Sequence, residues 1–144
     1  MRENGIVGAG GAGFPSYAKL NEKADTIILN CAECEPLLKL HRQVLEKYAF
    51  EIMTALTAVK EATQAERVII AVKPAYKGAV EAVKANLSSF KDISIGYLPE
   101  VYPAGDEVIT IYETTGRVVA PGAIPISVGC IVYNVETMLN LYFA

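Results

Sequence analysis

Residues 26–36 read TIILNCAECEP, an apolar run that passes directly into polar and acidic side chains. The apolar part is rich in β-branched residues and is bounded by Asp25 and Asn30, which predicts a short buried strand ending at Leu29. Open parallel sheets bind ligands outside the carboxyl ends of their strands. We therefore expect the polar residues from Asn30 onward to lie at a binding edge.

Further apolar runs alternate with amphipathic segments after this stretch. A long helix is predicted from Leu40 to Ala65, because its apolar residues recur at steps of three and four. A second buried strand is predicted over 67–72, a second helix over 76–87, and a third strand over 93–97. Strands and helices that alternate in this way indicate right-handed crossovers on a parallel sheet.

Prolines and glycines punctuate the chain from Pro99 onward. There we predict a helix over 106–114, small strands at 118–119 and 130–132, and a closing helix from about Asn134. No repeat or linker interrupts the pattern. An α/β fold with a single domain over residues 1–144 is therefore expected. The chain enters its glycine-rich segment after about four residues with no structural lead-in, and it stops in an apolar helical run without a cap or polar terminus. This suggests a domain excised from a longer modular protein.

The composition restricts the classes of partner. The chain has 144 residues, of which 52% are hydrophobic and 20% charged, as in a well-packed globular domain. A net charge of −3 and the lack of a basic stripe argue against nucleic acid. Apolar runs of at most about five residues predict no membrane insertion, and without a signal peptide we expect a cytoplasmic location.

A glycine-rich segment, Gly8-Ala-Gly-Gly-Ala-Gly13, matches the pattern G-x-G-x-x-G. Such glycines let the backbone approach a pyrophosphate at a helix N-terminus. The dinucleotide fingerprint also requires a strand before the segment and a helix directly after it. Here two apolar residues precede the segment and Phe14-Pro15 follows it. An ordinary dinucleotide fingerprint and a purely structural loop both remain open on this motif alone.

The segment after the first strand allows several kinds of chemistry. The Asn30 amide can donate and accept hydrogen bonds at a ring edge, and Glu33 and Glu35 could hold ribose hydroxyls. Cys31 and Cys34 form a C-x-x-C pair that could act as a thiol redox couple, although nearby acids raise thiol pKa values. A metal site would need further ligands, and three cysteines are one fewer than an all-cysteine [4Fe–4S] cluster requires. We predict neither a metal nor a cluster on this chain.

Two later motifs combine acids with a helix start. Residues 102–107 read YPAGDE and residues 134–137 read NVET. Each could be a helix N-cap with favourable charge in the first turn, or part of a ligand site.

Together, four ordered motifs carry a resemblance to a known family: GAGGAGFPSYAK over 8–19, NCAECEP over 30–36, YPAGDE and NVET. Residues 5–140 resemble the C subunit of the Rnf electron-transport complex and the NADH-binding flavoprotein subunit of respiratory complex I. Cobalamin reductase and the proline-reductase-associated electron carriers are related proteins.

The resemblance implies a Rossmann-like three-layer domain with a mainly parallel sheet and a glycine-rich nucleotide loop. It implies non-covalent FMN with NADH stacked on it, hydride transfer to the flavin, and electron transfer to iron–sulfur centres on absent modules or subunits. No catalytic acid or base is implied, because the protein stacks and orients the reactants. It also suggests a place at the cytoplasmic face of a membrane complex. The donor could instead be NADPH, and a docking domain that has lost nucleotide chemistry is the alternative function.

The resemblance also assigns roles by position. Gly8, Gly10 and Gly11 would let the backbone approach the flavin and nucleotide, Phe14 would stack near adenine, and Lys19 would meet phosphate. Asn30 would hydrogen-bond the flavin and Glu35 would contact the nicotinamide nucleotide. Tyr102, Gly105, Asp106 and Glu107 would line the shared pocket, and Asn134 and Thr137 would hold the flavin phosphate or ribityl chain.

Overall fold

The computed structural model describes residues 5–8, 16–21, 23–35 and 37–144. These residues form one sheet in which all neighbouring strands are parallel, in the order β3-β2-β1-β4. The strands are β1 (Thr26–Asn30), β2 (Arg67–Val72), β3 (Ile93–Tyr97) and β4 (Cys130–Asn134). The three strands predicted first and the one predicted at 130–132 are thus confirmed.

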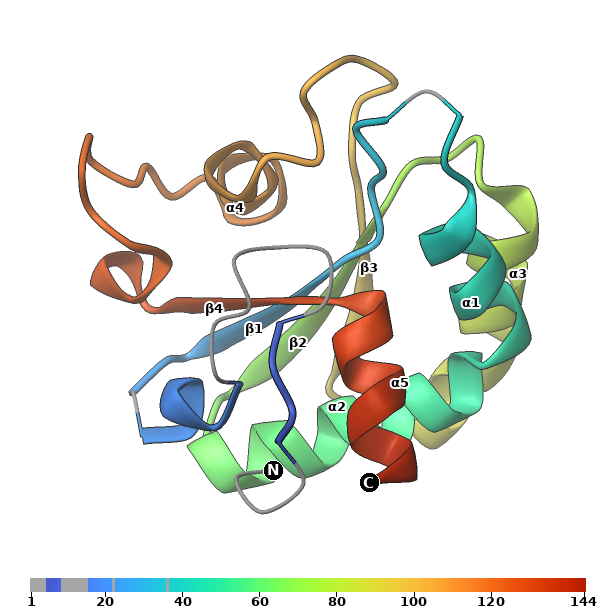
Figure 1. Ribbon diagram of the computed structural model, residues 1–144, viewed down its shortest axis with the longest axis horizontal. Helices are drawn as coiled ribbons and strands as arrows, with labels where there is room; N and C mark the ends of the chain where they lie inside the picture. Colours follow the sequence, from blue (N-terminus) through green and yellow to red (C-terminus); the bar gives the residue numbers. More distant parts are fainter. Residues whose placement is uncertain (1–4, 9–15, 22, 36) are drawn as a thin grey trace.

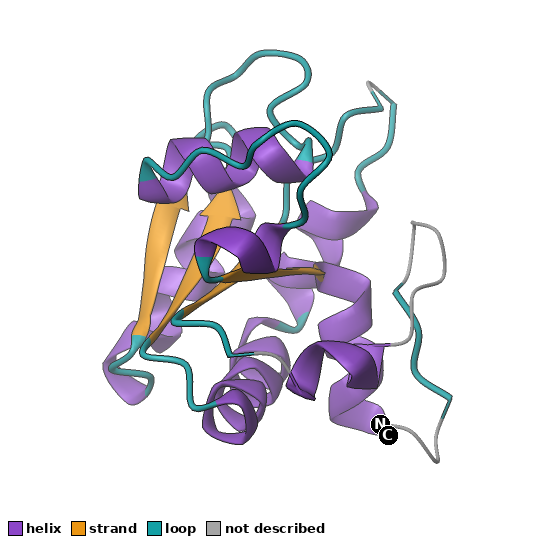
Figure 2. Cartoon of the chain, turned by 90° about the vertical axis from the view of Figure 1, so that its left-hand side faces the viewer, coloured by secondary structure: helices purple, strands orange, loops and turns teal. Residues whose placement is uncertain are grey.

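Helices cover both faces of the sheet, so the predicted three-layer α/β fold is confirmed (Figures 1 and 2). The α-helices are α1 (Leu40–Lys47), α2 (Ala49–Thr63), α3 (Lys77–Asn86), α4 (Glu107–Thr115) and α5 (Val135–Phe143). The 3-10 helices are η1 (Ser16–Asn21), η2 (Leu87–Ser89) and η3 (Pro125–Val128). Among the described residues, no helix has the length and apolar character needed to cross a bilayer.

Alternate residues of β1 point into two separate cores. Ile27 and Leu29 belong to the larger core, which the sheet forms with α1, α2, α3 and α5. Ile28 belongs to the smaller core on the α4 side. Every residue of β1 is buried because the strand is central and covered on both faces, as the near-continuous apolar run predicts.

The connections determine where the chain changes direction in the sheet. From β1 the chain proceeds outward to β2 and β3, and it then returns across the sheet to place β4 on the other side of β1. Because parallel crossovers are right-handed, reversing the direction moves the connecting helix α4 to the opposite face (Figure 1). The carboxyl ends of β1 and β4 therefore form a topological switch point.

The prediction of one long helix from Leu40 to Ala65 was wrong in one respect, because the structure has two helices, α1 and α2, that meet at Tyr48. Tyr48 has φ −124° and ψ 32°, outside the helical range. The backbone bonds from Tyr48 N–H to Val44 O and from Ile52 N–H to Tyr48 O persist at 2.9 and 3.0 Å. The hydrophobic period therefore continues through the kink, and sequence periodicity alone does not reveal it.

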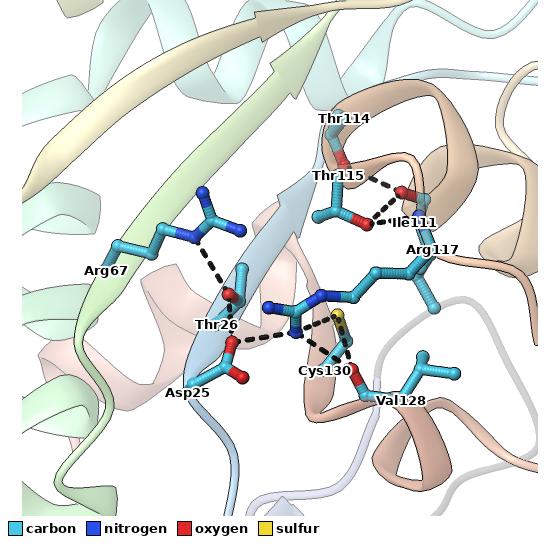
Figure 3. Close-up of polar contacts among 9 residues, drawn as sticks. All are labelled: Asp25, Thr26, Arg67, Ile111, Thr114, Thr115, Arg117, Val128 and Cys130. Atoms are coloured by element: carbon cyan, nitrogen blue, oxygen red, sulfur yellow. Dashed lines mark hydrogen bonds and ion pairs between the residues drawn. The ribbon is translucent and has the colours of Figure 1, made fainter.

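The small strand predicted at Val118-Val119 does not form. This stretch is irregular, with Val119 buried in the smaller core and Val118 exposed. The segment is held instead by a polar cluster at the amino edge of the sheet (Figure 3).

In that cluster, Arg117 Nη1 donates to Asp25 Oδ1 and to Val128 O, each at 2.8 Å. Arg67 Nε donates to the Thr26 hydroxyl at 2.9 Å, and this hydroxyl in turn donates to Asp25. The hydrogen bond from Arg117 lowers the pKa of Asp25 below its ordinary value. The cluster thus ties the segment after α4 to the start of β1.

Candidate cofactor-binding site

The switch point brings two asparagines together at the carboxyl edge. Asn30 ends β1 and Asn134 ends β4, and the two residues are register partners in the parallel ladder. Crevices at such points are the usual ligand sites of open α/β sheets. Residues 30 and 134, which belong to two motifs separated by about a hundred positions, therefore share one edge.

Asn30 fastens two loops to each other at this edge. Its buried side chain donates from Nδ2 to Gly105 O at 2.8 Å and accepts at Oδ1 from Ala32 N–H at 3.0 Å. A β-carbon on Gly105 would lie 2.8 Å from both Ala32 O and Cys34 Sγ, so only glycine fits there. We call this contact between residues 30–34 and 103–106 the loop clasp.

Asp106 and Glu107 have different roles at the start of α4. Asp106 is the N-cap, and its carboxylate accepts from Val108 N–H at 3.0 Å and from Ile109 N–H at 3.3 Å. Burial raises the pKa of Glu107, whereas the charge of Lys19 opposes this shift. Asp106 therefore positions the helix, and Glu107 contributes negative charge to the site.

Lys19 comes from η1 and contacts the end of β4. Its Nζ donates to Val132 O at 2.7 Å and lies 5.2 Å from the centroid of the Tyr133 ring. Burial lowers the pKa of Lys19, and the attraction of Glu107 partly offsets this effect. A partly desolvated ammonium of this kind gains stability from an anionic ligand such as phosphate.

The N-terminus of α5 lies at the same strand end. Asn134 occupies the N-cap position, but its side chain makes no capping hydrogen bond to the first turn. Thr137 is buried in that turn. The amide groups at a helix N-terminus bind phosphate readily, and the nearby Lys19 adds positive charge. These residues fit the phosphate of a flavin nucleotide.

The remaining predicted residues lie at or beside this edge. Glu35 and Tyr102 are exposed on the two loops that flank the clasp. Gly8 is partly exposed, whereas Gly10, Gly11 and Phe14 lie outside the described residues.

The glycine-rich segment does not have the flanks of an ordinary dinucleotide fingerprint. Ser16 N–H donates to Ile6 O at 3.1 Å, which joins the chain shortly before the segment to the chain shortly after it. In the described part of the chain, a 3-10 helix follows the segment, and the residues before it belong to no strand of the four-stranded sheet. The described residues on either side of the segment therefore differ from the strand and helix that the fingerprint requires.

Glu33 has a structural role instead of the predicted ribose contact. It is buried, and its Oε1 accepts from His41 N–H at 2.9 Å in the first turn of α1. Its Oε2 lies 3.7 Å from Arg42 Nε, and the Arg42 guanidinium lies 4.7 Å from the centroid of the Tyr76 ring. Glu33 thus anchors α1 to the loop after β1, and no spacing rule distinguishes it from Glu35.

The cysteines do not support a thiol couple. All three cysteines are free. Cys31 lies in the core on the α1 side, whereas Cys34 Sγ packs toward Gly105 on the α4 side. Burial raises the pKa of the Cys31 thiol far above its ordinary value, so this group is a poor nucleophile.

Tyr133 is a residue that sequence reasoning did not place in the site. It is buried beneath Lys19, and its hydroxyl has no hydrogen-bond partner among the described residues. Burial raises the pKa of this hydroxyl. In the sequence it reads as one more large residue of β4, so no pattern identifies it.

The fold and the site define a parallel α/β domain with a candidate cofactor-binding edge at a topological switch point. The family model described as Complex1_51K, the Nuo51 FMN-binding domain, matches residues 1–143. The chain therefore belongs to the Nuo51 FMN-binding domain family. This confirms the family expected from the four motifs and makes the chain an FMN-binding domain of the oxidoreductase, electron-transport class.

Individual relatives agree with this membership. The cobalamin reductase PduS of Citrobacter freundii is 46% identical over 141 residues, which cover 98% of this chain and 31% of the relative. The C subunit of the proton-translocating ferredoxin:NAD(+) oxidoreductase complex from Clostridium ljungdahlii is 35% identical over 145 residues, with coverages of 98% and 32%. The C subunit of the ion-translocating oxidoreductase complex from Haemophilus influenzae strain 86-028NP is 36% identical, with coverages of 95% and 21%.

A solved structure shares the fold. The NAD+-reducing [NiFe]-hydrogenase in its H2-reduced state superposes with a TM-score of 0.83 and 23% identity over 99% of this chain and 29% of that chain. This chain spans about a third or less of each of these relatives.

Proposed function

We propose that this chain is the FMN- and NADH-binding module of an electron-transfer protein, in which NADH reduces FMN and the electrons pass to iron–sulfur centres on other modules or subunits. The observation that carries the proposal is the pairing of Asn30 with Asn134 at the β1–β4 switch point, closed on one side by the loop clasp. Family membership supports the flavin, and the names of the relatives support electron transfer.

The residues at the edge divide into positioning and binding groups. Asn30 and Gly105 hold the two loops in place, and the remaining Asn30 hydrogen-bonding capacity would face the flavin. Lys19 and the first turn of α5, which includes Thr137, would hold phosphate. Glu35, Tyr102 and Glu107 would line the space for the nicotinamide nucleotide.

Bound FMN would supply the chemistry, since it accepts a hydride from a nicotinamide and releases electrons one at a time. This chain supplies the geometry. It stacks and orients the two rings and excludes water, and no side chain of the site needs to transfer a proton. NADH as donor is supported by the nicotinamide nucleotide that appears in the names of the ferredoxin:NAD(+) oxidoreductase complex and the hydrogenase. NADPH is the alternative donor.

The test is a titration of the purified chain with FMN, followed by anaerobic addition of NADH while the visible absorbance of the flavin is recorded. Saturable binding followed by bleaching is the expected result. If NADPH bleaches the bound flavin and NADH does not, the donor is NADPH and not NADH. An absence of FMN binding would contradict the proposal and favour a docking domain that has lost nucleotide chemistry.

A further inference from the structure

We infer that the hydroxyl of Tyr133 is a hydrogen-bond donor to the phosphate of the bound flavin nucleotide, which it contacts together with Lys19. The inference rests on the proposed function, because it names a further binding residue of the same site. Tyr133 stands outside the four sequence motifs, which cover residues 8–19, 30–36, 102–107 and 134–137.

Tyr133 carries a buried hydroxyl that the protein does not pair. The residue is 3% exposed, and its hydroxyl oxygen has no hydrogen-bond partner among the described residues. The oxygen is also closed to solvent, so bulk water does not pair with it either. Buried polar side-chain atoms nearly always have a partner, and one left without a partner destabilises the fold. A ligand that brings an acceptor to this hydroxyl removes that cost.

The fold places the hydroxyl on the side of the sheet where α5 begins. Side chains alternate along β4, so Val132 belongs to the smaller core on the α4 side and Tyr133 to the larger core that includes α5. Tyr133 directly precedes Asn134, the N-cap of α5. The phenol therefore adjoins the helix start whose amide groups would hold phosphate.

Lys19 supplies positive charge to the same place. Its Nζ lies 5.2 Å from the centroid of the Tyr133 ring and donates to the backbone oxygen of the preceding residue, Val132, at 2.7 Å. The ammonium is partly desolvated, and burial lowers its pKa, so an anion beside it is stabilising.

The two donors together favour a phosphate over an uncharged acceptor. A phosphate has several acceptor oxygens, and its charge-assisted hydrogen bonds are about twice as strong as neutral ones. One phosphate group can therefore accept from the ammonium and from the phenol through different oxygens. A ribityl hydroxyl could accept from Tyr133, but it would gain less from the charge of Lys19.

Tyr133→Phe tests the inference, because it removes the hydroxyl and keeps the ring beneath Lys19. The dissociation constant of FMN should rise about tenfold, since a hydrogen bond to a charged group is lost. Riboflavin lacks the phosphate, so the variant and the wild-type chain should bind it equally. Equal FMN affinity of the two chains, or an equal loss of FMN and riboflavin affinity, would overturn the inference.

Urea unfolding of the flavin-free chain distinguishes a ligand-binding hydroxyl from a structural one. Removing a buried hydroxyl that has no protein partner should leave the urea midpoint unchanged or raise it. Removing a hydroxyl that pairs within the protein would lower the midpoint, and this result would contradict the inference.

Tyr48→Phe is the matched control, because it makes the same change at another tyrosine packed against the larger core. The Tyr48 ring contacts Phe143 at the opposite end of α5, with the ring centroids 6.2 Å apart. This variant should bind FMN and riboflavin as the wild-type chain does. A loss of FMN affinity equal to that of Tyr133→Phe would show that the effect is not specific to Tyr133 and would overturn the inference.

A titration of the ¹⁵N-labelled full chain with inorganic phosphate separates this inference from the proposed function, because it requires no flavin. Phosphate should shift the amides of Tyr133, Asn134 and the first turn of α5, and Tyr133→Phe should weaken its binding. If phosphate binds in this way and FMN does not bind at all, the proposed function fails and the phosphate contact of Tyr133 stands. If neither phosphate nor FMN binds the wild-type chain, both are overturned.

Discussion

Replacing Asn30 by alanine should loosen the loop clasp and lower the free energy of unfolding. The change removes one hydrogen bond to Gly105 O at 2.8 Å and one from Ala32 N–H at 3.0 Å, both made by a buried side chain. Each bond contributes about 0.5–1.5 kcal/mol net, and a buried partner left unpaired adds to the cost. We therefore expect a loss of about 2–3 kcal/mol.

Urea unfolding followed by far-UV circular dichroism measures this loss. With a denaturant slope of about 2 kcal/mol/M for a chain of this size, the midpoint should fall by about 1–1.5 M. The same variant should bind FMN more weakly, because the loops that flank the switch point are no longer held together.

Asn86→Ala is the matched control. Its Nδ2 donates to Ala82 O at the same 2.8 Å, but it lies partly exposed at the end of α3. The control should lose less than about 1 kcal/mol and keep its FMN affinity. If the Asn30 variant unfolds at the same urea concentration as the Asn86 variant, the loop clasp does not have the structural role assigned to it.

Three further changes test other parts of the molecule. Gly105→Ala should destabilise the fold by about 1–3 kcal/mol and weaken FMN binding, because the new methyl group meets backbone at 2.8 Å. The control is Gly96→Ala on β3, where the new methyl group meets the Ile69 side chain of β2 at 2.8 Å; it should lower stability and leave FMN affinity unchanged. Lys19→Met should raise the dissociation constant of FMN about tenfold in an FMN titration, because Lys19 would hold phosphate beside the first turn of α5. An unchanged FMN affinity would contradict the assigned role. Arg117→Met should lower the free energy of unfolding by about 1 kcal/mol at neutral pH, a small loss because solvent screens this partly exposed ion pair. The hydrogen bond from Arg117 lowers the folded-state pKa of Asp25 below its ordinary 3.8. The difference in free energy of unfolding between the wild-type chain and this variant should therefore shrink as the pH falls through the pKa of Asp25. Urea midpoints that differ equally at all pH values would refute this role of Arg117.

The sheet was predictable because its signals are local. The runs at 26–29 and 67–72 are short, β-branched and bounded by polar residues, and each is a strand in the structure. The kink at Tyr48 was not predictable, since the backbone bonds on either side of it keep the helical period. The segment at 118–119 was predicted as a strand from β-branched residues alone, but no neighbouring strand of the described sheet is available there to pair with it.

The site was predictable at the level of motifs and not at the level of individual contacts. Strand order, which no single segment encodes, places Asn30 beside Asn134. Sequence spacing does not distinguish Glu33 from Glu35, yet burial against Arg42 makes the first a structural anchor and leaves the second exposed. Tyr133 reads as an ordinary strand residue, and only the fold brings it beneath Lys19.

The central claim is that FMN binds at the carboxyl edge between β1 and β4. The most direct measurement is an FMN titration of the ¹⁵N-labelled chain, with the amide shifts mapped onto the structure. The account predicts the largest changes at Asn30, Gly105 and the first turn of α5. Changes confined to the amino-edge cluster around Asp25 and Arg117, or no change at saturating FMN, would contradict it.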